Sequence, residues 1–193
     1  MNDHRPVWLL DIDGVINAVS RKPPTHVWPE EVWQQERVLN VMGLFPITWV
    51  QPVIDFLTEV HERGRAEIRW HTTWQEEAQL VADLTGLPVF PVADAPEFRS
   101  GSANAAAWIA AGGRIGAEPW WKLAAAQRVV QEERRPLVWT DDDITDALWN
   151  YDMGANFEAH APTLAVCPDH RTGLVRKDLD LIDTFLYDLE MNG

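Results

Sequence analysis

The stretch Val7-Trp8-Leu9-Leu10-Asp11-Ile12-Asp13-Gly14-Val15 decides the fold class of this chain. A short apolar run that ends abruptly in polar residues is typical of a buried strand in a parallel sheet. Open α/β sheets bind their ligands at the carboxyl ends of such strands. We therefore expect an α/β protein with a parallel sheet, helices on both faces of the sheet, and a ligand site directly after Leu10.

Two carboxylates, Asp11 and Asp13, follow this strand one residue apart. Side chains alternate along a strand, so the chain has to turn at or after Asp11 if both are to face one pocket, and Gly14 supplies the freedom for that turn. Two acids in one pocket repel each other unless a cation neutralises them, and Mg²⁺ bound by carboxylates and substrate phosphate oxygens meets this need. The alternative is a plain strand-ending turn, since Asp and Gly are common in turns.

Length and composition limit the class of protein. The chain has 193 residues, 46% of them hydrophobic and 24% charged, which suits one domain over 1–193 with an insertion. No apolar run reaches the roughly 18 residues of a membrane span, and the N-terminus lacks the apolar core of a signal peptide. A cytoplasmic protein without membrane contact is expected. The single cysteine, Cys167, excludes an internal disulfide.

The formal net charge of −14 disfavours an extended basic groove for nucleic acid, although a nucleotide or a nucleic-acid end remains open as substrate. Most of the eleven tryptophans are expected to pack in the interior. Trp74, Trp120 and Trp121 flank polar motifs, and these side chains could instead stack on a base or ring.

Apolar periodicity predicts alternating helices and strands along the rest of the chain. One helix is expected from Val50 to Val60, with a stop at Gly64, and another between Trp74 and Gly86. Strands are expected at 66–71, 136–140 and 163–167, an extended segment at 87–92, a weak helix within a loop at 103–111, and a helix at 121–133. A final helix has an apolar face formed by Leu179, Leu181, Ile182, Phe185, Leu186 and Leu189.

The strand predicted at 136–140 also ends in acids, Asp141-Asp142-Asp143, with Asp146 a short way on. Consecutive acids are costly unless they are solvated or bind a metal, so the alternative is an exposed turn that caps the next helix. Parallel strands end at the same edge of a sheet, and the acids after both strands are therefore expected to form one divalent-cation site. Lys122, at the start of a predicted helix, would strengthen an anion site there, or it is a solvated surface lysine.

Four motifs in this order resemble those of the haloacid dehalogenase superfamily of phosphohydrolases. They are Asp11-Ile12-Asp13-Gly14-Val15, a strand that ends in Thr72, a helix with Lys122, and a strand that ends in Asp141-Asp142. The segments 70–74 and 120–122, with 166–168 and 172–174, resemble the small domains of this superfamily associated with RNA-repair proteins. The resemblance implies a Rossmann-like sheet and a Mg²⁺-dependent phosphatase.

The resemblance also implies a role for each matching residue. Asp11 is the nucleophile that forms an aspartyl-phosphate, and Asp13 protonates the leaving oxygen and then takes a proton from water. Thr72 binds the transferring phosphoryl group, and Lys122 neutralises charge on that group and on Asp11. Because a carbon–halogen bond needs no proton for its leaving group, Asp13 favours phosphoryl transfer over dehalogenation.

The metal set implied in this way is Asp11, Asp13 through its backbone carbonyl, Asp141 and Asp142, with Asp143 or Asp146 as alternatives beside Asp141. Substrate contacts are expected from Gly14, Thr73 and Trp74, and Thr73 replaces Thr72 if the strand runs one residue further. His160 and His170 could contact substrate, although loop histidines are more often solvated.

The segment 17–46 is long for a plain connection, so a flap or small insertion is expected there. A modest lid leaves the site open to a large substrate. The expected function is therefore hydrolysis of a phosphomonoester such as a nucleotide or a polynucleotide end. The alternatives are a small-metabolite phosphatase and a non-catalytic, metal-dependent binding or regulatory module.

Overall fold

A computed structural model of the chain describes residues 4–93, 121–144 and 153–192. The fold is mixed α/β, and its centre is a four-stranded, all-parallel sheet in the order β4-β1-β5-β6. The strands are β1 (Val7–Leu10), β4 (Glu67–Trp70), β5 (Leu137–Thr140) and β6 (Thr163–Val166). The four predicted strands are confirmed, with ends that agree to within one residue.

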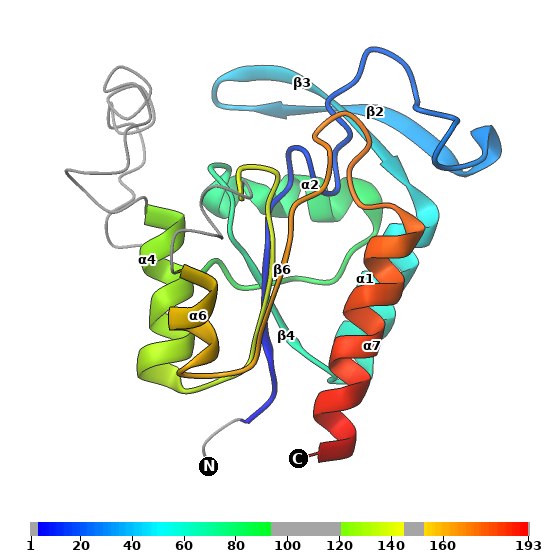
Figure 1. Ribbon diagram of the computed structural model, residues 1–193. Helices are drawn as coiled ribbons and strands as arrows, with labels where there is room; N and C mark the ends of the chain where they lie inside the picture. The colour runs from blue at the N-terminus through cyan, green and yellow to red at the C-terminus, as the bar shows by residue number, and fades with distance from the viewer. Residues whose placement is uncertain (1–3, 94–120, 145–152, 193) are drawn as a thin grey trace.

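Helices lie on both sides of this sheet (Figure 1). Helices α4 (Trp121–Arg128) and α6 (Met153–Glu158) lie on one side, and α1 (Gln51–Glu62) and α7 (Arg176–Asn192) lie on the other. The remaining helix, α2 (Ala78–Thr85), follows β4. A π-helical turn, η3 (Val129–Glu133), continues α4, so the helix predicted at 121–133 is confirmed over its whole length. Two short 3₁₀ turns, η1 (Glu30–Val32) and η2 (Gln75–Glu77), complete the described elements.

Alternation along the strands divides the core into two clusters. Trp8 and Leu10 of β1 pack with the apolar faces of α1 and α7, whereas Val7 and Leu9 pack with α4. In β5, Val138 belongs to the first cluster and Leu137 and Trp139 to the second. Residues 11 and 141, the next odd-numbered positions after these strands, therefore continue the face that α4 covers.

Helices α1 and α2 end where the sequence predicts. Gly64, after α1, and Gly86, after α2, have positive φ angles of 65° and 80°, which favour glycine.

The segment expected to be extended, 87–92, lies along the edge of the parallel sheet. Val92 forms an isolated bridge to Trp70 of the edge strand β4, so this segment covers the edge without forming a strand of its own. The weak helix predicted at 103–111 lies outside the described residues.

The predicted apolar face of α7 is wrong at one residue, Leu181. Leu179, Ile182 and Leu186 are buried at helical spacing, but Leu181 is 49% exposed. Two residues correspond to about 200° around a helix, and Leu181 therefore points away from the face that contains Leu179. In the described part of the chain, no helix is both long and apolar enough to cross a membrane.

An antiparallel hairpin, β2 (Trp33–Asn40) and β3 (Gly43–Val50), lies over the carboxyl ends of the parallel strands (Figure 1). It occupies the second half of the expected insertion, 17–46, and β3 runs on to Val50, directly before α1. The Asn17 side chain accepts a hydrogen bond from the Thr48 backbone N–H at 2.8 Å. This bond joins the hairpin to the segment that follows β1.

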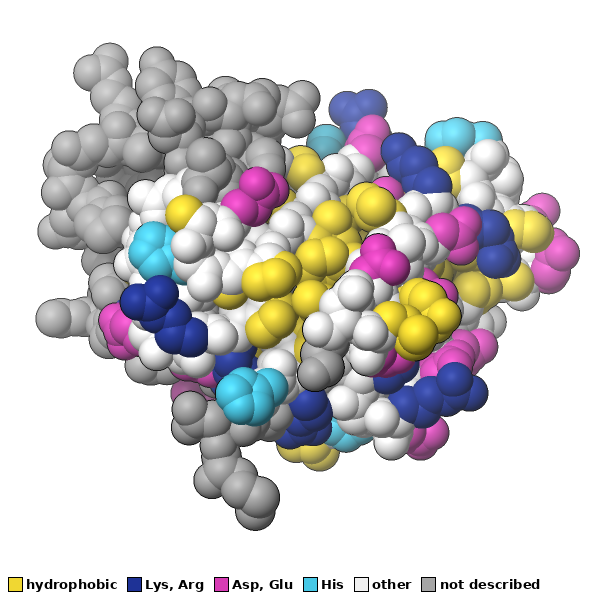
Figure 2. Space-filling model, turned by 60° about the horizontal axis from the view of Figure 1, so that its bottom comes forward, with side chains coloured by type: hydrophobic (Ala, Val, Ile, Leu, Met, Phe, Trp, Pro, Cys, Tyr) yellow, Lys and Arg dark blue, Asp and Glu magenta, His cyan; other side chains and the backbone are white. Residues whose placement is uncertain are grey.

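The opposite side of the molecule, which carries the chain ends in Figure 1, is turned forward in Figure 2. Basic and acidic side chains are mixed on this face, and they surround a group of apolar side chains. The ends of the parallel sheet therefore differ, since the carboxyl end has a hairpin above it and the amino end faces this mixed surface.

Candidate active site

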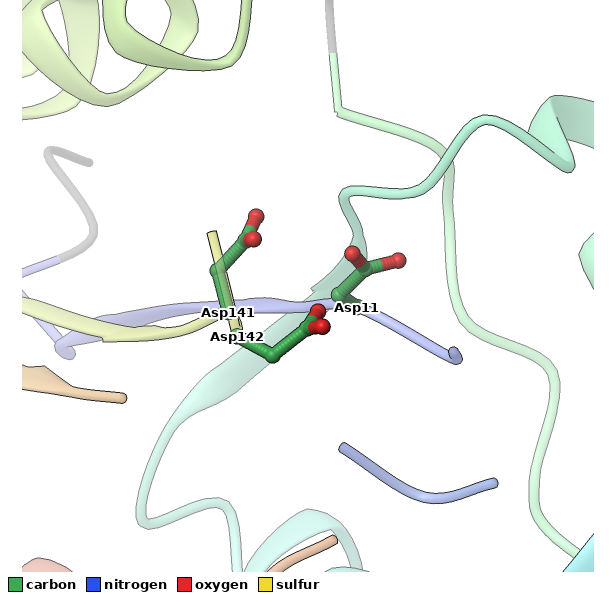
Figure 3. Close-up of side chains that lie close together, drawn as sticks. All are labelled: Asp11, Asp141 and Asp142. Atoms are coloured by element: carbon green, nitrogen blue, oxygen red, sulfur yellow. The ribbon is translucent and has the colours of Figure 1, made fainter. Parts of the chain in front are cut away.

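Three carboxylates, those of Asp11, Asp141 and Asp142, gather at the carboxyl ends of β1 and β5, and one oxygen of each lies within 4.8 Å of the others. The strands are neighbours in the sheet, and the Asp11 N–H donates to the Thr140 carbonyl at 3.2 Å. Figure 3 shows the carboxylate of Asp142 turned toward Asp11. The sheet thus brings together the acids that follow two strands far apart in sequence.

Lys122 of α4 reaches this cluster from the helix side of the sheet. Its ammonium contacts Asp11 Oδ2 and forms an ion pair with Asp141 Oδ2 at 2.7 Å, and the residue is only 3% exposed. The alternative of a solvated surface lysine is therefore wrong. Burial acts to lower the pKa of Lys122, but the charges of Asp11 and Asp141 outweigh it and raise the pKa.

The charges of this cluster do not balance. Among the residues that the structure describes, three carboxylates face one ammonium, so this group carries two excess negative charges when fully ionised. Burial raises the pKa of Asp142 to about 6, and the charges of Asp11 and Asp143 add to the effect. Burial also raises the pKa of Asp141, against the opposing charge of Lys122. A hard divalent cation fits three carboxylate ligands and this excess charge, because Mg²⁺ prefers oxygen donors.

Asp13 lies outside this cluster and is bound differently. Its Oδ1 accepts a hydrogen bond from the Asn17 amide at 2.7 Å, and its Oδ2 accepts one from the Trp74 indole N–H at 2.8 Å. Both donors are themselves linked to β3, since Asn17 binds the Thr48 backbone and the Phe45 ring packs edge-on against Trp74 at 5.5 Å between centroids. The hairpin therefore helps to fix the Asp13 carboxylate.

Gly14 allows the acids to take up these positions. Its φ angle is 73°, and a Cβ atom there would lie 2.2–2.6 Å from the carboxylate atoms of Asp142. The prediction that Gly14 supplies a turn is confirmed, and the glycine also makes room for Asp142. Its expected contact with substrate stays a prediction.

The two threonines after β4 lie in different surroundings. Thr72 is buried, and its hydroxyl accepts a hydrogen bond from the Trp74 backbone N–H at 3.4 Å, whereas Thr73 is exposed. The strand ends at Trp70, so it does not run far enough to exchange their places. Thr72 thus occupies the buried position next to His71, which pairs with the end of β1 through a 2.8 Å hydrogen bond to Leu10.

His71 and Asn17 have no role in the sequence-based hypothesis. His71 is fully buried against the rings of Trp121 and Trp139, with ring centroids at 5.3 and 5.8 Å. Burial and the charge of Lys122 hold the pKa of His71 well below its usual value, so the ring is neutral. His71 directly follows β4 at an odd-numbered position, on the face that α4 covers, and this alternation could have indicated its burial. Asn17 carried no comparable signal.

Other described residues that the sequence suggested for the site lie outside the acidic cluster. Asp143 is exposed, and its backbone N–H donates to Asp141 Oδ1 at 3.0 Å. His160 and His170 are exposed as well. Asp146 and Trp120 lie outside the described residues. Within the described part of the chain, the acidic cluster therefore consists of Asp11, Asp141 and Asp142.

Comparison of the chain with known protein families, with curated proteins and with solved structures finds no match. The function is therefore inferred from the geometry of the site.

Proposed function

We propose that this protein is a Mg²⁺-dependent phosphomonoester hydrolase with a Rossmann-like fold, of the haloacid dehalogenase type, that works through an aspartyl-phosphate on Asp11. The observation that carries the proposal is the position of Asp11. It lies at the carboxyl end of a central parallel strand, in contact with Lys122 and within 4.8 Å of two further carboxylates. A divalent cation would offset the excess negative charge of this arrangement and allow an anionic phosphate to approach Asp11.

The two carboxylates after β1 suit two different chemical tasks. Asp11 attacks phosphorus and forms a new P–O bond, while the bond from phosphorus to the substrate alcohol breaks and Asp13 gives its proton to the leaving oxygen. Asp13 then takes a proton from water, which attacks the aspartyl-phosphate and releases inorganic phosphate and free Asp11. Mg²⁺ held by Asp11, Asp141 and Asp142 would neutralise charge between the anionic nucleophile and the anionic phosphate.

The remaining polar groups hold these two carboxylates and the phosphoryl group in place. Lys122 orients Asp11 and balances part of its charge, and Thr72 is the candidate hydrogen-bond donor to the phosphoryl oxygens. Trp74 and Asn17 act as positioning residues for Asp13, because each binds one oxygen of its carboxylate. A module that only binds metal has no need for a second, separately oriented acid, and this favours the enzyme.

Phosphate release tests the proposal. The wild type is assayed with and without Mg²⁺ on an aryl phosphate, nucleotides, sugar phosphates and oligonucleotides with 3′- or 5′-phosphates. We expect Mg²⁺-dependent release that Asp11→Asn lowers by at least about 10⁴-fold, as for removal of a nucleophile. Asp83→Asn, an exposed change on α2, is the matched control and should retain activity.

The preferred substrate in this panel separates a nucleotide or nucleic-acid phosphatase from a small-metabolite phosphatase. Release that persists in Asp11→Asn would contradict the role of this residue. Mg²⁺ binding without release from any substrate would favour the binding module.

A further inference from the structure

A groove of about 600 Å³ lies beside the proposed active site, between the segment that follows β1 and the β2–β3 hairpin. Asn17 and Thr48 line it where these two segments join, and Arg21, Gln35 and Arg37 also line it. None of these residues except Asn17 has a part in the proposed chemistry. The groove is therefore a second feature of the same edge of the sheet.

Asn17 connects the groove to Asp13. The Asn17 amide donates to Asp13 Oδ1 at 2.7 Å, and the same residue lines the groove. Under the proposed function, Asp13 protonates the oxygen of the leaving alcohol. The alcohol part of the substrate therefore lies on the Asp13 side of the phosphorus atom, where the groove begins.

The basic side chains of the groove differ in their partners from four other described arginines. Arg63, Arg65, Arg69 and Arg135 each form an ion pair with at least one carboxylate. Arg21 and Arg37 are exposed and form no ion pair with any residue in the described part of the chain. Glu36 is the one carboxylate among the described residues of the lining, so these residues carry an excess of positive charge in a chain of net charge −14.

We propose that this groove binds a second phosphate, carried on the alcohol part of the substrate, through Arg21 and Arg37. Guanidinium groups bind phosphate oxygens in pairs, and unpaired arginines beside an acidic site would draw an anionic group to one side of it. The inference rests on the proposed function and narrows its substrate class to phosphomonoesters with a further phosphate nearby. A small bisphosphate and the terminal phosphate of an oligonucleotide both supply this chemistry.

The test compares substrates with and without a second phosphate. We measure kcat/KM for a nucleoside 3′,5′-bisphosphate, for a terminally phosphorylated dinucleotide and for p-nitrophenyl phosphate, in the wild type, Arg21→Ala, Arg37→Ala and Arg63→Ala. The wild type should prefer a substrate with a second phosphate. Each groove variant should lower that preference about tenfold, the loss of one charge-assisted hydrogen bond, mainly through KM. Arg63→Ala removes an exposed arginine directly after α1 that does not line this groove, and it should change the preference less than about twofold.

The outcomes separate this inference from the proposed function. Preference for the dinucleotide over the bisphosphate identifies a nucleic-acid end, and the reverse identifies a small bisphosphate. Turnover with no preference, or a preference that the arginine variants leave intact, would overturn the proposed phosphate binding in the groove. The proposed hydrolase function would stand. Equilibrium binding of the bisphosphate to Asp11→Asn, with and without each arginine substitution, gives a second readout. If no substrate is turned over, the proposed function fails, and equal binding with and without Arg21 and Arg37 overturns the groove as well.

Discussion

Two ionic clusters lie on the α4 side of the sheet, at opposite ends of its strands, and they differ in charge balance. Among the described residues, the cluster at the amino ends contains two cations and two anions, Arg69, Arg135, Glu67 and Glu133, in contacts of 2.6–3.4 Å. The cluster at the carboxyl ends contains one cation and three anions, Lys122, Asp11, Asp141 and Asp142. Counted over the part of the chain that the structure describes, the first cluster is balanced and the second has excess negative charge.

The pKa shifts of the acids follow this difference. Burial would raise the pKa of Glu67, but hydrogen bonds and charges from Arg69 and Arg135 outweigh it and lower the pKa. For Asp142, burial and the neighbouring carboxylates raise the pKa to about 6. The two clusters show that the charges of an ionic network can balance among its own side chains or can require a bound ligand. Here the balanced network supports the fold, and the unbalanced one is the candidate site.

The largest expected effect comes from removing the central cation of each cluster. Lys122→Met leaves buried carboxylates without their partner and should lower the free energy of unfolding of the metal-free protein by about 3–5 kcal/mol. Arg69→Met should cost about 1 kcal/mol, because its partners are more exposed to solvent. Urea unfolding of both variants without Mg²⁺ checks this prediction. An equal cost for the two substitutions would mean that the clusters do not differ as argued.

A smaller effect is expected at Asp13, which N–H donors hold in place of a cation. Trp74→Phe keeps an aromatic ring but removes the indole N–H, and should lower kcat about 10- to 100-fold on alkyl phosphates, whose leaving oxygen needs a proton. The loss on p-nitrophenyl phosphate should be much smaller. Trp28→Phe is the matched control, since it removes the indole hydrogen bond to Leu174 O and leaves Asp13 untouched. A uniform loss on both kinds of substrate would assign Trp74 a structural role only.

The contributions of the two clusters to the free energy of unfolding should also differ in their pH dependence. Folding raises the pKa of Asp142 from about 3.9 to about 6, so the folded state holds more protons, and the stability linked to this group is lost as pH rises from about 4 to 7. After solvent screening this amounts to about 1–2 kcal/mol. The lowered pKa of Glu67 has the opposite sign, since its contribution is present above about pH 4.3 and is lost as pH falls.

Thermal unfolding at pH 5 and pH 8, with and without Mg²⁺, measures this dependence. Mg²⁺ binds the ionised carboxylates, so it should raise the melting temperature more at pH 8 than at pH 5. Asp142→Asn should remove much of the difference, whereas Glu67→Gln should retain it. A Mg²⁺ effect that is larger at pH 5 would contradict the account.

The sequence predicted those parts of the fold and the site that depend on local patterns. The apolar run before Asp11 and the acids after Thr140 each identified a strand and the edge where it ends. Parallel pairing then placed Asp11 beside Asp141 and Asp142, as expected, although Asp13 lies outside this cluster. The burial of Lys122 was less predictable, because it depends on how α4 packs on the sheet and not on the residues beside it.

The contacts that fix Asp13 could not be predicted for the same reason. Trp74 lies 61 residues from Asp13, and its indole N–H binds the Asp13 carboxylate. The expected contact of Trp74 with substrate stays a prediction. Asn17 forms its second link to Thr48, which lies on a hairpin whose register had not been predicted. Such long-range hydrogen bonds arise from the packing of separate elements, which no local pattern encodes.

The most direct test of the central claim is calorimetric titration of Mg²⁺ into the wild type, Asp142→Asn and Glu133→Gln at pH 8. If the unbalanced cluster is the cation site, the wild type binds one Mg²⁺, and Asp142→Asn weakens binding by at least about tenfold because it removes a charged ligand. Glu133→Gln, in the balanced network, leaves the affinity unchanged. Equal binding by the wild type and Asp142→Asn, or no binding by the wild type, would contradict the account.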